Sequence, residues 1–391
     1  MALTKLNTYS LADDAITSAK IADNAVVTAA IADDAVTSAK TTVTSTNPNL
    51  IINGDMAIAQ RGTSSTSTGI KTVDRWNALW TGGGITQSQV ALTSGGPYDE
   101  GHRHAFKMAV TSVNSANNRY AQMRYIPEAK DIRNFGWQYT SGSSYITVSF
   151  WAKSSLAGTY FFSMYGPDSG TAQIYSTSYA LAADTWTKIT KTIPGGSNIV
   201  LNDDTGIGFY IDIRLDLGTD YTASDATINA WADRVASDAK TTTDFAQSWF
   251  NTGSATFEVT GVKLEVGQSA TTFEKLDYTA EFQRCQRYYW TIRGDEGQDY
   301  SNNYGFLVQW SSSRFSGWNP SWTQNFPVEM RGIPTTTIVG TWGTSNAGTP
   351  GLGGYKSKMT AIILLSGTTA TSGTYMHFNS TDDAITFDAE L

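Results

Sequence analysis

A tenfold repeat near the start of the chain limits what this region can fold into. Residues 11–20, 21–30 and 31–40 read LADDAITSAK, IADNAVVTAA and IADDAVTSAK. An apolar residue recurs every five positions, and the six are Leu11, Ile16, Ile21, Val26, Ile31 and Val36. Ten residues over three helical turns give about 3.3 residues per turn, so a continuous helix is strained. One copy also has too little apolar surface to fold alone, which predicts a stalk or anchor of three chains around a common axis. The alternative is a disordered leader.

The rest of the chain is predicted to form two further domains. With 391 residues, the chain is too long for one ordinary core. Residues 41–49 read as a short linker. We therefore expect a stalk or anchor at 1–46, a β-sandwich at 47–278 and a small C-terminal β domain at 279–391.

Alternating apolar and polar residues predict strands in the middle of the chain. Residues 145–152, 207–215 and 257–266 each show this alternation, and in the last segment it changes phase at Gly261. Such a change is typical of a β-bulge. Strands separated by turns, without regularly alternating helices, predict an antiparallel β-sandwich.

Two segments have helical spacing instead. Residues 225–239 place Ile228, Trp231, Val235 and Ala239 on one face and predict a helix packed on the sandwich. Residues 279–289 predict a second helix, with Asp277 or Thr279 near its start and Cys285 on its buried face. The chain beyond it alternates again, up to Leu391, and predicts strands.

Composition excludes several functional classes. Charged residues make up 16% of the chain against about 25% on average, and the net charge is −8. No cluster of Lys and Arg is visible, so we expect no nucleic-acid partner. No apolar run is long enough for membrane insertion, and no secretory signal is visible. Release by cell lysis, as part of a virus particle, fits a β-rich protein of this kind. A single cysteine excludes an intrachain disulfide.

The sequence offers no convincing catalytic constellation, so we expect no enzyme, no catalytic residues, no metal and no cofactor. His102 and His104 have no third metal ligand and read as parts of a solvated loop. Asp212 and Asp216 lie about 13 Å apart on a strand, too far for a glycosidase pair. A charge ladder with Arg214 between them is the interpretation that we favour.

Aromatic residues support a binding function. Neutral sugars are bound by aromatic faces and short polar side chains, and the chain has 12 tryptophans. The candidate glycan-binding residues are Trp76, Trp80, Trp310, Trp318 and Trp322. The alternative for each is packing in a domain core or a trimer contact. Because few charges are available, we expect glycan binding to depend little on salt.

Several segments resemble bacteriophage fibre proteins that carry a carbohydrate-binding-like jelly roll. They are NLIINGDMAIAQRGTS (49–64), VDRW (73–76), ITVSFWAKSSLAGTY (146–160), FEVTGVKLEVGQSATTFEK (257–275), FQRCQRYYW (282–290) and FPVEMRGIPT (326–335). The decad repeats also resemble the stalks of such fibres. The match covers nearly the whole chain by pattern.

The resemblance implies a homotrimeric fibre on the virion surface that binds host surface polysaccharide. It also implies attachment to other virion proteins through the N-terminal segment. A tail fibre is the first expectation, a head fibre or capsid decoration protein the second, and a polysaccharide depolymerase the third. Jelly rolls of this kind often bind structural calcium. Here Asp55 is available, but Thr260, Gly261 and Val262 stand where an acidic pair is expected, which leaves calcium open.

Overall fold

The structure is a computed structural model, and it describes residues 48–234, 240–293, 306–310, 321–345, 350–365, 374–377 and 383–391. The chain divides into two units, Met1–Thr46 and Asn47–Leu391, and the second contains all the described residues. The predicted stalk at 1–46, with its apolar stripe, lies outside them. No helix among the described residues is long and apolar enough to cross a membrane.

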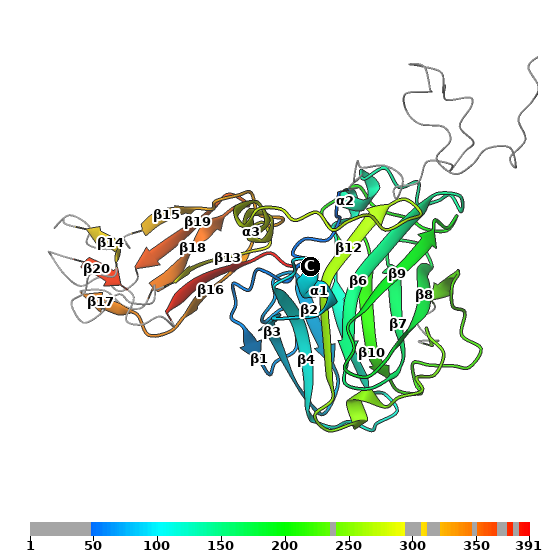
Figure 1. Cartoon of the computed structure of the whole chain (residues 1–391). Helices are drawn as coiled ribbons and strands as arrows, with labels where there is room; N and C mark the ends of the chain where they lie inside the picture. Colours follow the sequence, from blue (N-terminus) through cyan, green and yellow to red (C-terminus); the bar gives the residue numbers. More distant parts are fainter. Residues whose placement is uncertain are drawn as a thin grey trace, which may run out of the picture. The chain divides into compact units, whose positions relative to one another are not determined.

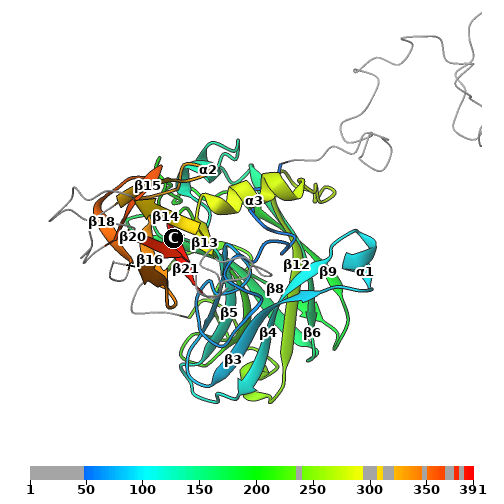
Figure 2. The ribbon, with the colours of Figure 1, turned by 90° about the vertical axis from the view of Figure 1, so that its left-hand side faces the viewer.

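Two antiparallel sheets pack face to face in the described residues (Figures 1 and 2). The first contains, in order across it, β1 (Ser64–Ser65), β3 (Gly84–Ala91), β4 (His104–Ser112), β12 (Thr256–Val266), β6 (Tyr145–Ser154) and β9 (Thr187–Pro194). The second contains β11 (Trp231–Arg234), β8 (Ala172–Leu181), β7 (Gly158–Gly166), β10 (Tyr210–Leu217), β5 (Tyr120–Tyr125) and β2 (Trp76–Trp80). The predicted antiparallel β-sandwich is confirmed. Short helices lie in the connections: α1 (Gly96–Asp99), α2 (Ala129–Arg133) and a 3-10 turn (Trp249–Asn251).

The core lies between the two sheets. Successive side chains of a strand point to opposite faces, so each alternating segment has one buried face. Ile146, Val148 and Phe150 of β6 are fully buried, and the Phe150 ring lies 6.2 Å from that of Phe162 on the opposite sheet. Burying each such side chain contributes about 2 kcal/mol. The predicted strands at 145–152 and 257–266 are confirmed, and the one predicted at 207–215 begins at Tyr210.

Gly261 forms the predicted bulge in β12. Its φ is +62°, and the register between β12 and β6 shifts between Thr260 and Lys263. A Cβ at this position would lie 2.7 Å from Nε2 of His102. Glycine is therefore required both by the backbone conformation and by the space available.

Helix α3 (Tyr278–Gln286) follows the sandwich, as predicted. The Asp277 carboxylate accepts a hydrogen bond from the backbone N–H of Ala280 at 3.0 Å and caps the helix. Cys285 is 1% exposed, and burial raises the pKa of its thiol well above the ordinary value. It is a packing residue, as the sequence indicates.

Three small antiparallel sheets make up the described C-terminal region. Their strands, in order across each sheet, are β13 (Tyr289–Arg293), β21 (Ala384–Asp388) and β16 (Thr335–Val339); β14 (Phe306–Trp310), β20 (Thr374–His377) and β17 (Gly343–Ser345); and β15 (Ser321–Asn325), β19 (Thr360–Leu365) and β18 (Pro350–Lys356). Phe326, Met330, Ile385 and Phe387 form a separate small core. The strand predicted near the C-terminus is confirmed, because β21 pairs with β13 and β16.

The predicted helix at 225–239 is wrong within the described residues. Trp231–Arg234 is a strand that pairs with β8, and Asn229 before it has a φ of +60°. A positive φ interrupts a right-handed helix. Trp231 packs within the sandwich instead, with its ring on Tyr175 and its indole N–H donating to the carbonyl of Pro194 at 2.7 Å.

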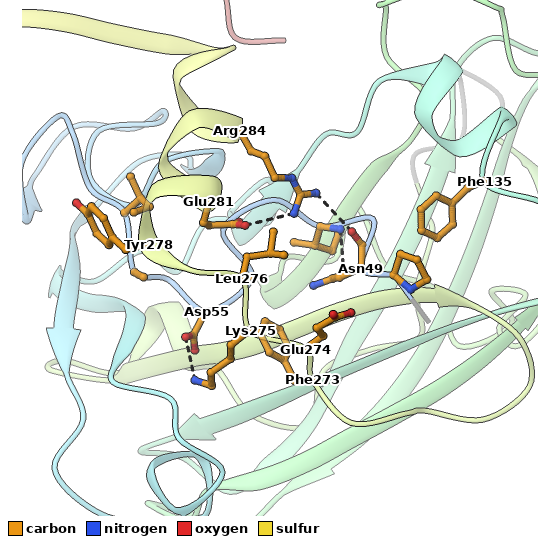
Figure 3. A pocket seen from close by; sticks show the side chains of 15 residues that line it. Asn49, Asp55, Phe135, Phe273, Glu274, Lys275, Leu276, Tyr278, Glu281 and Arg284 are labelled. Atoms are coloured by element: carbon orange, nitrogen blue, oxygen red, sulfur yellow. Dashed lines mark hydrogen bonds and ion pairs between the residues drawn. The ribbon is translucent and has the colours of Figure 1, made fainter. Parts of the chain in front are cut away.

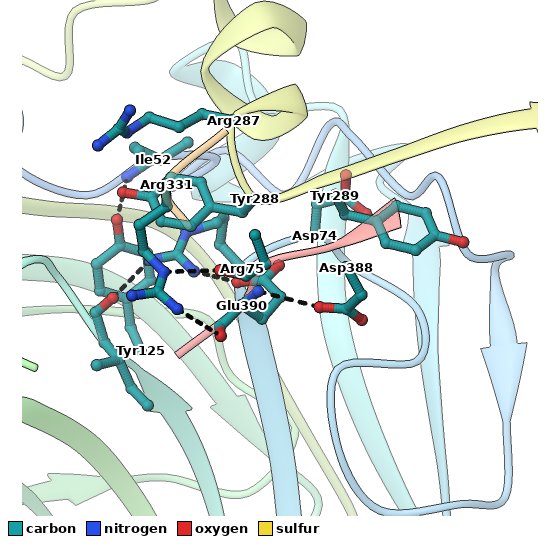
Figure 4. Close-up of polar contacts among 12 residues, drawn as sticks. Ile52, Asp74, Arg75, Tyr125, Arg287, Tyr288, Tyr289, Arg331, Asp388 and Glu390 are labelled. Atoms are coloured by element: carbon teal, nitrogen blue, oxygen red, sulfur yellow. Dashed lines mark hydrogen bonds and ion pairs between the residues drawn. The ribbon is translucent and has the colours of Figure 1, made fainter. Parts of the chain in front are cut away.

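A buried polar junction joins the sandwich to the C-terminal region (Figure 4). Arg75 forms an ion pair with Glu390, while Nη2 of Arg61 lies 3.1 Å from an oxygen of Asp388. On a neighbouring part of the junction, Glu128 accepts two hydrogen bonds from Arg287, each of 2.9 Å. Arg75 of the VDRW segment therefore serves to dock the C-terminal region on the sandwich.

Candidate functional site

The outward face of the second sheet carries polar and aromatic side chains. Ala121, Met123 and Tyr125 of β5 point into the core, so the intervening positions of this strand face outward. The same alternation in β10 buries Ile211 and Ile213. The outward residues of the two strands are Tyr120, Gln122, Arg124, Tyr210, Asp212 and Arg214. The register shifts between Arg214 and Asp216, so Leu217 rather than Asp216 lies opposite Tyr120 on this face.

A groove of about 210 Å³ crosses this face. Its lining includes Tyr120, Gln122, Arg124, Arg214, Tyr221 and Arg234. With Leu79 also in the lining, four strands of one sheet (β2, β5, β10 and β11) and the loop after β10 contribute to it. Because most of these side chains stand on paired strands, their positions are largely fixed before any ligand arrives.

Arg124 is held in a fixed orientation. Its Nε and Nη2 donate to the two oxygens of Asp212 at 2.6 and 3.0 Å, and its guanidinium lies 4.4 Å from the centroid of the Tyr210 ring. Burial lowers the pKa of Arg124, but the charge of Asp212 outweighs this, so the pKa is raised. The group is a permanent cation at the edge of the groove.

Arg214 is buried among like charges. Its Nη1 donates to Oγ1 of Thr241 at 2.8 Å, and its Nη2 lies 3.6 Å from Asp212. Within the described residues, its Nε has no hydrogen-bond partner. Burial, together with the charges of Arg124 and Arg234, lowers the pKa of Arg214 to about 10. Of the predicted charge ladder of Asp212, Arg214 and Asp216, the contact between Asp212 and Arg214 is present and Arg124 extends it. Asp216 pairs with Arg119 at 3.2 Å instead, because the register of β10 on β5 shifts between Arg214 and Asp216.

Tyrosine rings surround these cations. Tyr165 and Tyr210 stack with centroids 5.4 Å apart and planes 12° from parallel. Tyr120 and Tyr221 meet edge to face at 6.1 Å. Arg234 lies over the Tyr165 ring at 4.8 Å. Rings and guanidinium groups side by side can bind both the C–H face and the polar groups of a sugar.

The two candidate tryptophans near the start of the sandwich are not at the surface, and this prediction was wrong. Trp76 is fully buried and Trp80 is 9% exposed. The alternation of β2 turns both rings into the core, where Trp76 lies 5.4 Å from the Tyr125 ring. The side chains of Trp310, Trp318 and Trp322 lie outside the described residues, so those candidates stay predictions.

The structure also corrects the role of His102. The sequence predicted a solvated loop, but His102 is 1% exposed and pairs with Asp55. Nζ of Lys275 lies 3.0 Å from the other oxygen of Asp55. Asp55, the residue available for calcium, is thus bound by two side chains of the protein, His102 and Lys275. Among the described residues, no group of three or more His, Cys, Asp or Glu is arranged to hold a metal ion.

A second cavity of about 370 Å³ lies beside α3 (Figure 3). Tyr278, Glu281 and Arg284 of the helix line one part, and Asp55 and Lys275 line another. Arg284 is 3.2 Å from Glu281, and Lys275 pairs with Asp55. These charged groups bind one another, which makes this cavity less suited to a polar ligand than the groove.

Sequence reasoning missed most of the groove. It identified Asp212, Arg214 and Asp216 on one strand face. The other two arginines of the groove stand on other strands: Arg124 lies 88 residues before Asp212, and Arg234 lies 18 residues after Asp216. The alternation of YAQMRY at 120–125 was the available signal for outward Tyr120, Gln122 and Arg124.

No protein-family model and no curated protein sequence matches this chain. Solved structures with distant similarity to this chain include the following three. The enzymatically active domain of tailspike protein 4 of bacteriophage CBA120 is 12% identical, with a TM-score of 0.32 over 56% of this chain and 21% of that one. A family 11 carbohydrate-binding module of Clostridium thermocellum, in complex with a mixed-linked tetrasaccharide, is 14% identical, with a TM-score of 0.25 over 52% and 95%. The tripod of the bacteriophage Tuc2009 baseplate is 14% identical, with a TM-score of 0.24 over 59% and 58%. Similarities this low do not assign a function, which is therefore inferred from the chain's own residues.

Proposed function

We propose that this protein is a structural protein of a bacteriophage virion that binds host surface glycans through the groove on the second sheet. The observation that carries the proposal is the combination of Tyr120, Tyr221, Gln122 and three guanidinium groups on one rigid, outward face. Sugar rings pack their C–H faces on aromatic rings, and their polar groups need fixed donors. The groove supplies both.

The proposed role is binding without catalysis. Hydrolysis of a glycosidic bond usually needs two carboxylates, one of them free to transfer a proton. Asp212 is bound by both forked nitrogens of Arg124. Asp216 accepts the backbone N–H of Phe250 at 2.7 Å and lies 3.2 Å from Arg119. Incubation with host polysaccharide should release no reducing ends; release in proportion to protein would favour a depolymerase.

We further propose that three copies assemble through the decad repeat of residues 11–40. The motive is the apolar stripe, which one copy cannot bury. Light scattering on the full chain should give about three times 42.3 kDa. A monomer at working concentrations would contradict this part of the proposal. Three copies would raise avidity by about 10²–10⁴ if all can engage at once.

The binding role is tested with tyrosine variants of the full chain. Tyr120→Ala and Tyr221→Ala each remove an aromatic surface of the groove and should weaken binding to host cells about tenfold or more. Tyr278→Ala is the matched control, because this tyrosine is 65% exposed and belongs to α3. Equal binding by all three variants, with unchanged melting temperatures, would exclude the groove as the adhesive site.

A further inference from the structure

The charge of the groove is opposite to that of the chain. The formal net charge of the protein is −8. Arg124, Arg214 and Arg234 line the groove, and Asp212 is the one carboxylate among the described residues that pairs with any of them. The lining therefore has an excess of two positive charges. A surface for neutral sugars does not need this excess.

Among the groove residues, Arg214 gives the strongest argument for an anionic ligand. A buried guanidinium is stable only when paired and hydrogen-bonded. Here the side chain is 9% exposed, its closest carboxylate is already bound by Arg124, and its Nε has no partner within the described residues. Two further arginines face it, and their repulsion opposes its charge. A bound anion beside the guanidinium would relieve this repulsion.

Arg234 offers donors at the edge of the same groove. Its guanidinium contacts the Tyr165 ring at 4.8 Å and, among the described residues, forms no ion pair. A guanidinium has five N–H donors in a planar fork that matches a carboxylate or a phosphate. Asp212 supplies one negative charge against three arginines. The positive charge that remains on Arg214 and Arg234 is therefore available to an anion.

We infer that the groove binds an acidic group of an anionic saccharide, with Arg214 and Arg234 as its ligands and Tyr120 and Tyr221 against the sugar ring. The inference rests on the proposed glycan-binding function and specifies its ligand. The charge of the saccharide is a carboxylate of the sugar or a phosphodiester of the glycan chain, since the forked guanidinium accepts both. The groove, at about 210 Å³, is smaller than the roughly 300–1,000 Å³ that encloses drug-sized ligands, and suits one acidic unit of a chain.

This inference reverses the expectation that binding depends little on salt. Oppositely charged groups at the surface are screened with a Debye length of about 10 Å at 0.1 M salt and about 30 Å at 0.01 M. The affinity of the full chain for an anionic glycan should therefore fall as salt is raised. A neutral glycan in the same groove would show no such fall.

The experiment compares three forms of the surface polysaccharide extracted from host cells: native, carboxyl-reduced, and cleaved at its phosphodiesters with hydrofluoric acid. Binding to immobilised full-length protein is measured at about 0.01 M and about 0.1 M salt. We expect one of the two treatments to weaken binding about tenfold or more, and that treatment identifies the source of the charge. Arg234→Gln should weaken binding to the native form about tenfold, and Arg234→Lys should weaken it less.

Arg103→Gln is the matched control, because Arg103 is an exposed arginine that also lies over a tyrosine ring, at 4.1 Å from that of Tyr98. It should bind like the unmodified protein. If both treated polysaccharides bind as tightly as the native form and salt has no effect, the anionic ligand is excluded while the proposed function stands. If the native polysaccharide does not bind, the proposed function fails with it. If Arg234→Gln does not fold, the treated polysaccharides and the salt series still test whether the ligand is anionic.

Discussion

Arg75 pairs with Glu390 across 315 positions of sequence. Its guanidinium is 1% exposed, lies 3.5 Å from the centroid of the Tyr288 ring, and donates from Nη2 to the carbonyl of Ile126 at 2.5 Å. The backbone of Arg75 has a φ of +72°, which is uncommon for a residue with a side chain. Arg75 therefore combines a buried, paired charge with an uncommon backbone conformation.

Glu390→Gln should destabilise the protein by about 3 kcal/mol, because it leaves the Arg75 guanidinium buried without a carboxylate. Denaturant unfolding of the full chain measures the loss. Glu329→Gln is the control, since Glu329 is an exposed carboxylate of the same region, and it should change stability by less than about 0.5 kcal/mol. Equal stability of the two variants would show that the pair does not hold the junction.

Gly261→Ala should cost about 1–3 kcal/mol, because alanine must adopt a left-handed backbone and its Cβ meets the His102 ring. Gly253→Ala is the control, because a Cβ there meets no atom within 4 Å. Thermal unfolding compares the two. A Gly261→Ala protein as stable as the control would contradict the bulge conformation.

Acid should weaken the junction at Glu128. Burial raises the pKa of this carboxyl, but the hydrogen bonds from Arg287 and Tyr288 and the charge of Arg287 outweigh it, so its pKa lies below the ordinary 4.5. The unfolded chain thus binds the proton more tightly than the folded chain does. The stabilisation is present above about pH 4.5 and is lost as the pH falls through the lower folded value. Glu128→Gln should flatten the stability curve in this acidic range, whereas Glu274→Gln, at an exposed site, should not.

Trp76→Ala should cost about 3–5 kcal/mol, since this ring is fully buried. The same change tests the corrected role of the residue. At a temperature where the variant remains folded, its binding to host cells should equal that of the unmodified protein. A variant of normal stability that binds less would restore Trp76 as a contact residue.

The strands were predictable from sequence because one period-2 pattern determines both the strand and its buried face. β6 and the bulge at Gly261 follow from it directly. Trp231 shows where a pattern misleads, because one large ring at helical spacing mimics a helix. The burial of His102 depends on Asp55, a partner 47 residues away. No local sequence pattern indicates this pairing. The groove likewise depends on which strands become neighbours.

The same neighbour order has a consequence for how the chain folds. β12 lies between β4 and β6, pairing with both, yet it follows β6 by about a hundred residues. During synthesis, β4 and β6 therefore each have one unpaired edge until Thr256–Val266 leaves the ribosome. Pairing over such distances is slow, and exposed edges can join other chains. We expect the period before β12 arrives to be the time at which this protein is most prone to aggregate, so that a chaperone would be most useful then.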